Sequence, residues 1–432
     1  MNRERKQITI RPQQQFAWLG ITALLLIGAL TAGNVYGRGV WMFAALFAAL
    51  LIGCICDALV FDGQRLKRRG PQALFGFLAL GRKRELTPEE IETISTSVTS
   101  ARRHGALVYH TTISGAGLRW VISSRQSNYA RLIKALFSAV SPNVLDPRSR
   151  DLLDYWPEPE QLRTWQSAAL SPASMTPPRM WRQLANNFAL TGQFEIAARY
   201  FRLAYRQDSR NPQLLYELGR FLHLRVRFEA KTVGSEQRRS RKHLSTAFSS
   251  RRAEACLRLA GRLARADAVL LERIGETFFE SHQDSLALRY FERALQANSH
   301  RLRASIGLAE VALRSGQAAR TVYYYRTAAG VAEAQGNDSL AQLAERQADY
   351  YERLREDDRF LDAEMQRLNL LDQLKWARRG AMFAFLAAWL VHLTCYQLAP
   401  SVQQISREIS ATSAIIWLTT ITASYFFSQR RN

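Results

Sequence analysis

Few residues in this chain have the types and the spacing that nucleotide chemistry requires. Gly76 and Gly81, followed by Arg82 and Lys83, resemble a phosphate-binding loop. In such a loop the lysine follows the second glycine directly and a serine or threonine comes next, so that backbone and side chain can hold phosphate and Mg²⁺. Here the lysine is displaced by one position and arginine follows it. The sequence therefore predicts no nucleotide site at this position.

Candidates for acid–base or metal chemistry are equally few. Glu89, Glu90 and Glu92 gather carboxylates, but the charged face of a capped helix explains them better than a catalytic pair. No histidine stands at metal-ligand spacing from another histidine or a cysteine. His392 and Asp57 interrupt apolar stretches, and we interpret them as a helix–helix hydrogen-bonding group and an interfacial residue. The sequence predicts no catalytic residue, no metal and no cofactor, and hence no enzyme.

Composition limits the class of protein and of partner. The 432 residues include 59 Lys+Arg against 37 Asp+Glu, a formal net charge of +22. Such a surplus favours an anionic partner, either nucleic acid or an acidic membrane surface. The chain is 47% hydrophobic, which excludes a disordered protein. Four cysteines in so long a chain exclude a disulfide scaffold.

Apolar stretches near both ends predict membrane spans. Uncharged runs cover 16–36 and most of 40–61, and similar runs cover 380–398 and 411–428. A helix needs about 20 apolar residues to cross a bilayer. A second run follows the first at once, so we prefer a retained span to a cleaved signal peptide. We expect two transmembrane hairpins, at 16–61 and 380–428.

Arginine and lysine flank these runs asymmetrically. They cluster in the first 15 residues, after Phe61, before Gly380 and at the C-terminus, whereas the two opposite loops hold only Arg38 and Arg407. Basic loops stay in the cytoplasm. The sequence therefore predicts an integral protein of a bacterial inner (cytoplasmic) membrane, with both termini and the central region in the cytoplasm and with contacts to anionic lipid.

The region 62–145 has the signals of a small α/β module. Thr87 followed by Pro88 and Glu90 is typical of a helix start, and we expect that helix to reach Arg103. The segments 107–113 and 118–123 are rich in β-forming residues, with a glycine-containing turn between them that predicts a hairpin. A second helix follows, with these residues on one face: Tyr129, Ile133, Leu136, Phe137 and Val140.

Residues 119–122 (Arg-Trp-Val-Ile), the helix after them and Pro142 resemble the membrane-proximal α/β domain of conjugation-type coupling ATPases. The resemblance covers only residues 87–145. The ATPase domain of those proteins is absent here.

A repeat of 34 residues begins at Pro178. Pro212 opens the second unit 34 residues later. The repeated large, small and aromatic positions are Trp181, Leu184, Ala185, Phe188, Ala197, Phe201 and Ala204 in the first unit, Leu215, Leu218, Gly219 and Leu222 in the second, Leu271, Ile274, Gly275, Phe278, Ala287, Phe291 and Ala294 in the third, and Leu308, Ala309, Ala312, Tyr325 and Ala328 in the fourth. This pattern resembles tetratricopeptide repeats. The resemblance implies a helical solenoid over 178–335 that binds peptides in a concave groove, with Asn187, Arg220 and Glu276 as candidate groove residues.

The second unit departs from the repeat. Ala253, Leu257 and Ala260 take the expected positions of its second helix only if 22 extra residues precede them. This insert near 226–248 holds Arg238, Arg239, Arg241 and Lys242. Two interpretations are open: a solvated loop, or a basic arm that contacts an acidic partner, lipid headgroups or nucleic acid.

The expected fold is mainly α, a tetratricopeptide-like helical solenoid with a small α/β module between two transmembrane hairpins. The predicted regions are a basic tail (1–15), a transmembrane hairpin (16–61), the α/β module (62–145), a Pro/Trp-rich linker (146–177), the solenoid (178–335), capping and connecting helices (336–379), a second transmembrane hairpin (380–428) and a basic tail (429–432). We expect a membrane scaffold that binds protein partners to assemble or position a membrane-associated complex. The alternative is a component of a DNA or protein secretion or transfer apparatus that contacts an anionic partner through the basic insert.

Overall fold

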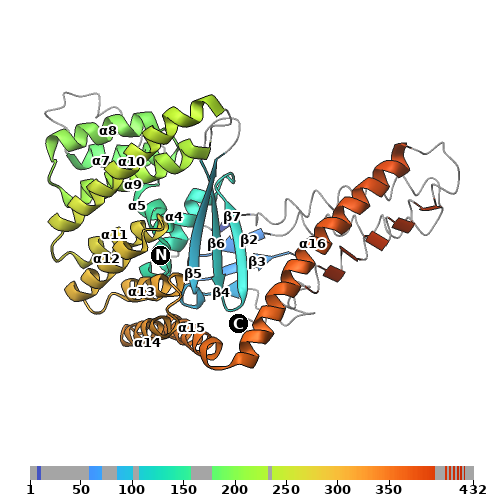
Figure 1. Cartoon of the computed structure of the whole chain (residues 1–432). Helices are drawn as coiled ribbons and strands as arrows, with labels where there is room; N and C mark the ends of the chain where they lie inside the picture. Colours follow the sequence, from blue (N-terminus) through green and yellow to red (C-terminus); the bar gives the residue numbers. More distant parts are fainter. Residues whose placement is uncertain are drawn as a thin grey trace, which may run out of the picture. The chain divides into compact units, whose positions relative to one another are not determined.

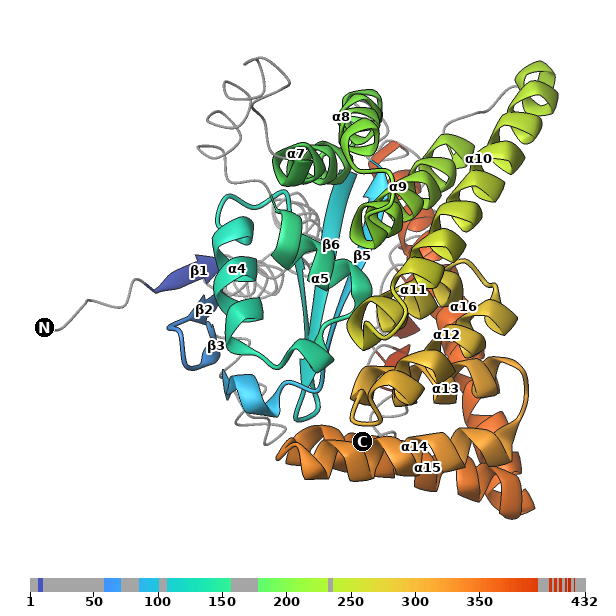
Figure 2. The same ribbon diagram turned by 90° about the vertical axis from the view of Figure 1, so that its left-hand side faces the viewer.

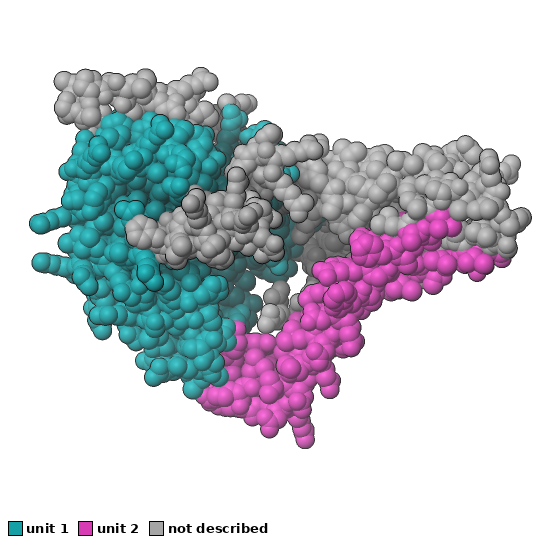
Figure 3. All heavy atoms as spheres, turned by 45° about the horizontal axis from the view of Figure 1, so that its top comes forward, with its two compact units in different colours: residues 1–348 teal, residues 349–432 magenta. Residues whose placement is uncertain are grey.

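The computed structural model of the chain describes residues 7–10, 58–70, 85–100, 107–156, 178–231 and 236–394, and isolated positions between 404 and 423. It divides into two compact units, residues 1–348 and 349–432 (Figure 3). All β-structure described below belongs to the first unit, together with the helices from α4 to α14.

The first unit contains two antiparallel sheets. One has the order β1-β2-β3-β4, from Ile8–Ile10, Ala58–Phe61, Leu66–Arg69 and Glu85–Leu86. The other has the order β5-β6-β7, from Thr93–Ser100, Leu107–Gly115 and Leu118–Ser123. Buried residues of both sheets share one hydrophobic core with the helix α4 (Tyr129–Ala139).

The predicted hairpin and the helix after it are confirmed. β6 pairs antiparallel with β7, from His110 opposite Ser123 to Gly115 opposite Leu118. Ala116 and Gly117 form the turn, and both have positive φ (45° and 74°). A two-residue hairpin turn of this kind matches the twist of the strands, and glycine adopts its second position without strain.

The predicted helix over 87–103 is wrong. A single 3-10 turn occupies Pro88–Glu90, where Oε2 of Glu90 accepts the N–H of Thr87 at 2.9 Å. The capping signal at Thr87 therefore marks a single helical turn and not a longer helix. β5 follows at Thr93, because its sequence TISTSVTS is rich in β-branched residues and buries Ile94 and Thr96 on one side.

The first sheet includes two strands from outside the predicted α/β module 62–145. β1 comes from the expected basic tail, and β2 comes from the end of the expected first transmembrane hairpin. Leu59, Val60 and Phe61 are apolar because they are buried in the sheet, not because they face lipid. The rest of the predicted hairpin, 11–57, lies outside the described residues.

The expected linker at 146–177 begins with a helix. α5 occupies Pro147–Tyr155, and the Asp146 side chain caps it by accepting the N–H of Ser149 at 2.8 Å. The same carboxylate accepts the N–H of Thr96 at 3.1 Å, which ties α5 to β5. Residues 157–177 lie outside the described part of the chain.

Four pairs of helices follow α5. They are α7 (Pro178–Leu190) with α8 (Phe194–Gln207), α9 (Pro212–Lys231) with α10 (Glu236–Leu263), α11 (Ala268–Glu280) with α12 (Asp284–Ala297), and α13 (Leu302–Arg314) with α14 (Ala318–Ala334). Figure 1 shows these pairs around one side of the β5-β6-β7 sheet. Repeat positions such as Leu184, Phe201, Ile274 and Phe291 are buried between the helices.

The insert in the second pair lengthens both helices. α9 has 20 residues and α10 has 28, whereas α7 and α11 have 13 each and α8 and α12 have 14 each. Only residues 232–235 of the predicted insert lie outside the described helices. The interpretation as a solvated loop is therefore wrong. Ala253, Leu257 and Ala260 are fully buried, as their repeat positions predict.

Two helices occupy the region 336–379, where capping and connecting helices were predicted. They are α15 (Asp338–Glu356) and α16 (Asp358–Thr394). Asp357 divides them, because its Oδ1 accepts the N–H groups of Arg359 and Phe360 at the start of α16.

The prediction of four membrane spans is contradicted. No described helix combines the length and the apolar character that a membrane crossing requires. α16 is charged up to Arg379, and its described apolar part, 380–394, is shorter than the roughly 20 residues a span needs. This finding contradicts the prediction of an integral membrane scaffold. It also contradicts the predicted inner-membrane location, the cytoplasmic orientation and the contacts with anionic lipid.

Candidate functional site

α5 lies along the inner side of the helix pairs. Figure 2 shows it between the β5-β6-β7 sheet and the helices α9 and α11, and α5 also contacts α7. This inner side consists of the first helix of each pair, the surface where the tetratricopeptide resemblance places a peptide groove. Described residues of the chain itself therefore occupy much of the predicted groove.

Arg150 of α5 enters a buried ionic cluster on α11 and α13. Its Nη1 lies 3.2 Å from Oε1 of Glu272 and 3.5 Å from Oε2 of Glu276. Arg301 donates two hydrogen bonds to Glu272, at 2.8 and 3.0 Å, and Arg303 donates one to Glu276 at 2.9 Å. The Glu272 side chain is fully buried, so these arginines provide the compensation that a buried carboxylate needs.

Glu217 of α9 is the centre of a second network. Its carboxylate accepts hydrogen bonds from Tyr155 at 2.7 Å, Arg182 at 2.6 Å, Asn186 at 2.9 Å and Gln213 at 3.0 Å. These donors come from α5, α7 and α9, and the network therefore joins the end of α5 to two helix pairs.

Further along α5, Asp151 forms an ion pair with Arg220 of α9. Arg220 also donates to the hydroxyl of Tyr216 at 2.9 Å. Burial raises the pKa of the Asp151 carboxyl to about 7, although the positive charge of Arg220 acts in the opposite direction.

This shift predicts a pH dependence of stability. The pKa of Asp151 lies near 3.9 in the unfolded chain. Because the folded chain binds more protons between that value and about pH 7, the contribution of Asp151 is present at low pH and lost as pH rises through 7. Urea unfolding at pH 5 and pH 8 should show a larger loss of stability in the unchanged protein than in Asp151→Asn. Equal pH dependence in the two proteins would contradict the raised pKa.

Of the three candidate groove residues in unit 1, Asn187 and Glu276 are buried and Arg220 is half-buried. Asn187 is 2% exposed, Arg220 pairs with Asp151, and Glu276 lies between Arg150 and Arg303. The structure thus brings Arg220 and Glu276 to the same inner surface, against the chain's own helix. Whether they contact a partner protein stays a prediction.

Sequence reasoning missed the groups that dominate this surface, Arg150, Glu217 and Glu272. One signal could have found the two glutamates: each is a charged residue amid the apolar residues of a first helix, directly after Tyr216 and Leu271. Charged residues are rarely buried without a partner, so such positions point to an ion pair. Arg150 carries no comparable signal, because it lies outside the repeats.

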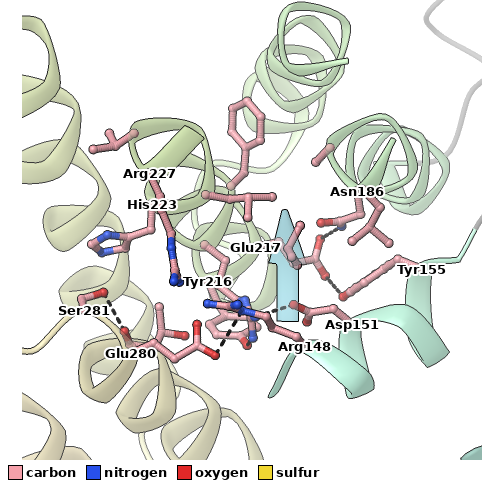
Figure 4. A pocket seen from close by; sticks show the side chains of 18 of the residues that line it. Arg148, Asp151, Tyr155, Asn186, Tyr216, Glu217, His223, Arg227, Glu280 and Ser281 are labelled. Atoms are coloured by element: carbon pink, nitrogen blue, oxygen red, sulfur yellow. Dashed lines mark hydrogen bonds and ion pairs between the residues drawn. The ribbon is translucent and has the colours of Figure 1, made fainter. Parts of the chain in front are cut away.

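An open cavity of about 410 Å³ remains beside α5. Figure 4 shows it between α5 and the helices of the repeats. Its walls combine apolar residues, such as Leu190, Phe221 and Leu224, with charged residues of both signs.

The outer side of α10 carries a second candidate surface. Arg251, Ala255, Arg258, Leu259 and Arg262 are all exposed there. They line a shallow groove of about 270 Å³ together with Glu254, which pairs with Arg258 at 2.7 Å. The buried side of the same helix is formed by Ala253, Leu257 and Ala260.

The other predicted contact residues, Arg238, Arg239, Arg241 and Lys242, belong to the first turns of α10. Their side chains lie outside the described part of the chain. The helical backbone nevertheless fixes which of them share a side of α10, because residues three and four apart lie on one face.

Two comparisons with known proteins return nothing similar. No family model matches the chain, and no curated protein matches it significantly. The resemblances to tetratricopeptide repeats and to the coupling-ATPase domain therefore stay predictions. The same holds for the expectation that the chain is not an enzyme. Among the described residues, no cluster of His, Cys, Asp and Glu could hold a metal ion.

Proposed function

We propose that this protein is a scaffold built on helical pairs, and that it binds an acidic helical segment of a partner protein along the outer side of α10. The observation that carries the proposal is a stripe of arginine and apolar residues on an exposed helix face. The inner surface is the weaker candidate for a protein partner, because α5 occupies most of it through the ion pairs of Arg150 and Asp151.

The stripe lies on the C-terminal half of α10. Its members follow one another in steps of four, three and four residues: Arg251, Ala255, Arg258 and Arg262. This spacing places them on one side of the helix, as along the seam of a coiled coil. In the described part, that side is exposed and stands opposite the buried Ala253 and Leu257. The stripe thus has the pattern of a surface that receives a second helix.

The chemistry of the stripe favours protein over nucleic acid. Leu259 is 39% exposed beside Ala255, so the arginines border an apolar strip. Protein interfaces combine an apolar centre with a polar border rich in arginine, whereas a phosphate backbone offers no apolar partner. An amphipathic helix with glutamate or aspartate beside its apolar residues would match both parts.

Charge reversal tests this function. The variant is Arg251→Glu/Arg258→Glu/Arg262→Glu, and the control is Arg199→Glu/Arg202→Glu/Arg206→Glu on the exposed side of α8, which changes the net charge equally. The probe is a synthetic amphipathic helix of about 20 residues with leucine at the seam and glutamate beside it, followed by fluorescence anisotropy. We expect micromolar binding by the unchanged protein and the control, and at least about tenfold weaker binding by the variant.

Two further probes decide between classes of partner. The same peptide with lysine in place of glutamate should not bind. A DNA duplex of about 20 base pairs tests the nucleic-acid part of the transfer-apparatus alternative, with a steep salt dependence as its signature. Tighter binding of the duplex than of the acidic peptide, equal losses in variant and control, or no binding of the acidic peptide would each overturn the proposal.

A further inference from the structure

The cavity beside α5 is large enough for a small organic molecule. Its volume of about 410 Å³ falls within the range of small-molecule sites, roughly 300–1,000 Å³. Residues from α5, α7, α9 and α11 line it, and Val98 and Tyr109 of the β5-β6-β7 sheet contribute as well. A ligand here would therefore contact both the α/β module and the helix pairs.

The acidic residues of the cavity wall already have cationic partners. Asp151 pairs with Arg220, Glu217 pairs with Arg182, and Glu280 lies 3.7 Å from Arg148. Since Arg182 is not a lining residue, Glu217 is neutralised from outside the cavity. After these pairs are counted, the arginines that line the cavity carry one positive charge more than the acidic residues that line it.

Arg227 carries that surplus charge. It makes no ion pair with any side chain that the structure describes. The Arg227 side chain is exposed, and partial burial together with the nearby charge of Arg148 lowers its pKa, while the charge of Glu280 acts in the opposite direction. An anion beside Arg227 would supply the counter-charge that the described side chains do not provide. A single surplus charge matches a group of charge −1, such as a carboxylate.

The remaining residues that line the cavity indicate what the rest of the ligand would be. Ala189, Leu190, Phe221 and Leu224 supply apolar surface for an apolar body. Nε2 of His223 and Oε1 of Gln283 are buried and have no hydrogen-bond partner. Buried polar atoms without partners are rare in native proteins, and here two of them belong to residues that line one cavity. Figure 4 shows His223, Arg227 and Arg148 around the same space.

We propose that this cavity binds a small monocarboxylic acid with an apolar body, whose carboxylate pairs with Arg227 and whose site includes His223 and Gln283. This site is independent of the α10 stripe. Burial and the charge of Arg220 lower the pKa of His223, so its imidazole is neutral and offers a hydrogen bond without adding charge.

The test uses the full chain and named probes. Hexanoate and benzoate are titrated by calorimetry, with hexanamide and benzamide as neutral molecules of the same shape and inorganic phosphate as a second anion. The variant is Arg227→Gln. The control is Arg225→Gln, which changes an arginine of the same helix that pairs with Glu195 and does not line the cavity.

We expect at least one of the two carboxylates to bind the unchanged protein and Arg225→Gln equally. Arg227→Gln should weaken that binding at least about tenfold, the effect of one lost charge-assisted contact. Circular dichroism checks that the variants fold. Equal affinity for acid and amide, equal loss in the two variants, preference for phosphate, or absence of carboxylate binding would overturn the proposal. None of these outcomes bears on the peptide experiment at α10.

Discussion

Replacing Glu272 by alanine should lower the free energy of unfolding by about 3–5 kcal/mol, the usual cost of removing one member of a buried ion pair. Glu272 is fully buried and accepts hydrogen bonds from Arg150 and Arg301. Without it, Arg150, itself 9% exposed, keeps only the 3.5 Å contact with Glu276 and the carbonyl oxygen of Pro142. Urea unfolding followed by tryptophan fluorescence measures the loss.

A matched control separates this cost from the removal of any glutamate. Glu280 lies on the same helix α11, is 29% exposed and stands 3.7 Å from Arg148. Glu280→Ala should cost no more than about 1 kcal/mol, because a partly hydrated pair gains little. Adding Arg150→Met to Glu272→Ala should recover part of the loss, since a charge without its main partner is replaced by an apolar side chain. Equal costs for Glu272→Ala and Glu280→Ala would contradict the buried network.

The helical pairs could be predicted from the sequence because their information is local and periodic. Leu184, Ala197 and Phe201 stand at fixed positions of a repeated unit, and burial of such positions needs only neighbouring units. The β6–β7 hairpin was equally accessible, since its turn lies between two β-rich segments. In contrast, the capping signal at Thr87 describes only the first turn and says nothing about how far the helix continues.

The errors have a common physical origin in long-range pairing. β2 pairs with β1 across about 50 residues, so Leu59 and Phe61 are apolar for a reason that no local window contains. An apolar run alone does not distinguish a buried strand from part of a membrane span. The inner surface was missed for the same reason: Arg150 meets Glu272, 122 positions further along the chain. Only the three-dimensional arrangement shows that α5 fills the predicted groove.

The second large effect is expected at Phe291 of α12. This side chain is 1% exposed, and both Gly275 of α11 and Gly307 of α13 face its ring. A Cβ atom at Gly307 would lie 2.5 Å from Cζ of Phe291, and one at Gly275 would lie 2.8 Å from Cδ1. Phe291→Ala should therefore cost about 3–5 kcal/mol, because it opens a cavity between two helix pairs.

The effect of replacing Gly307 on the free energy of unfolding should depend on whether the ring of Phe291 is present. In the unchanged protein, Gly307→Ala should cost about 1–3 kcal/mol, since the new methyl group overlaps a ring packed on all sides. In the Phe291→Ala background the same change should stabilise by about 1 kcal/mol, because the methyl group enters the cavity and alanine favours the helix.

Gly330→Ala in α14 is the control, since a Cβ atom there meets nothing within 4 Å. It should stabilise by about 0.5–1 kcal/mol in both backgrounds. Urea unfolding of the two single variants at Gly307 and Gly330, alone and combined with Phe291→Ala, measures these values. A change of sign at Gly307 but not at Gly330 is the expected result, and the same sign at Gly307 in both backgrounds would show that the ring of Phe291 does not separate α11 from α13.

Because Phe291 belongs to the second helix of its pair and the two glycines belong to first helices of successive pairs, this coupling measures how one pair stacks on the next. That stacking sets the spacing of the inner surface on which α5, Glu272 and the cavity depend.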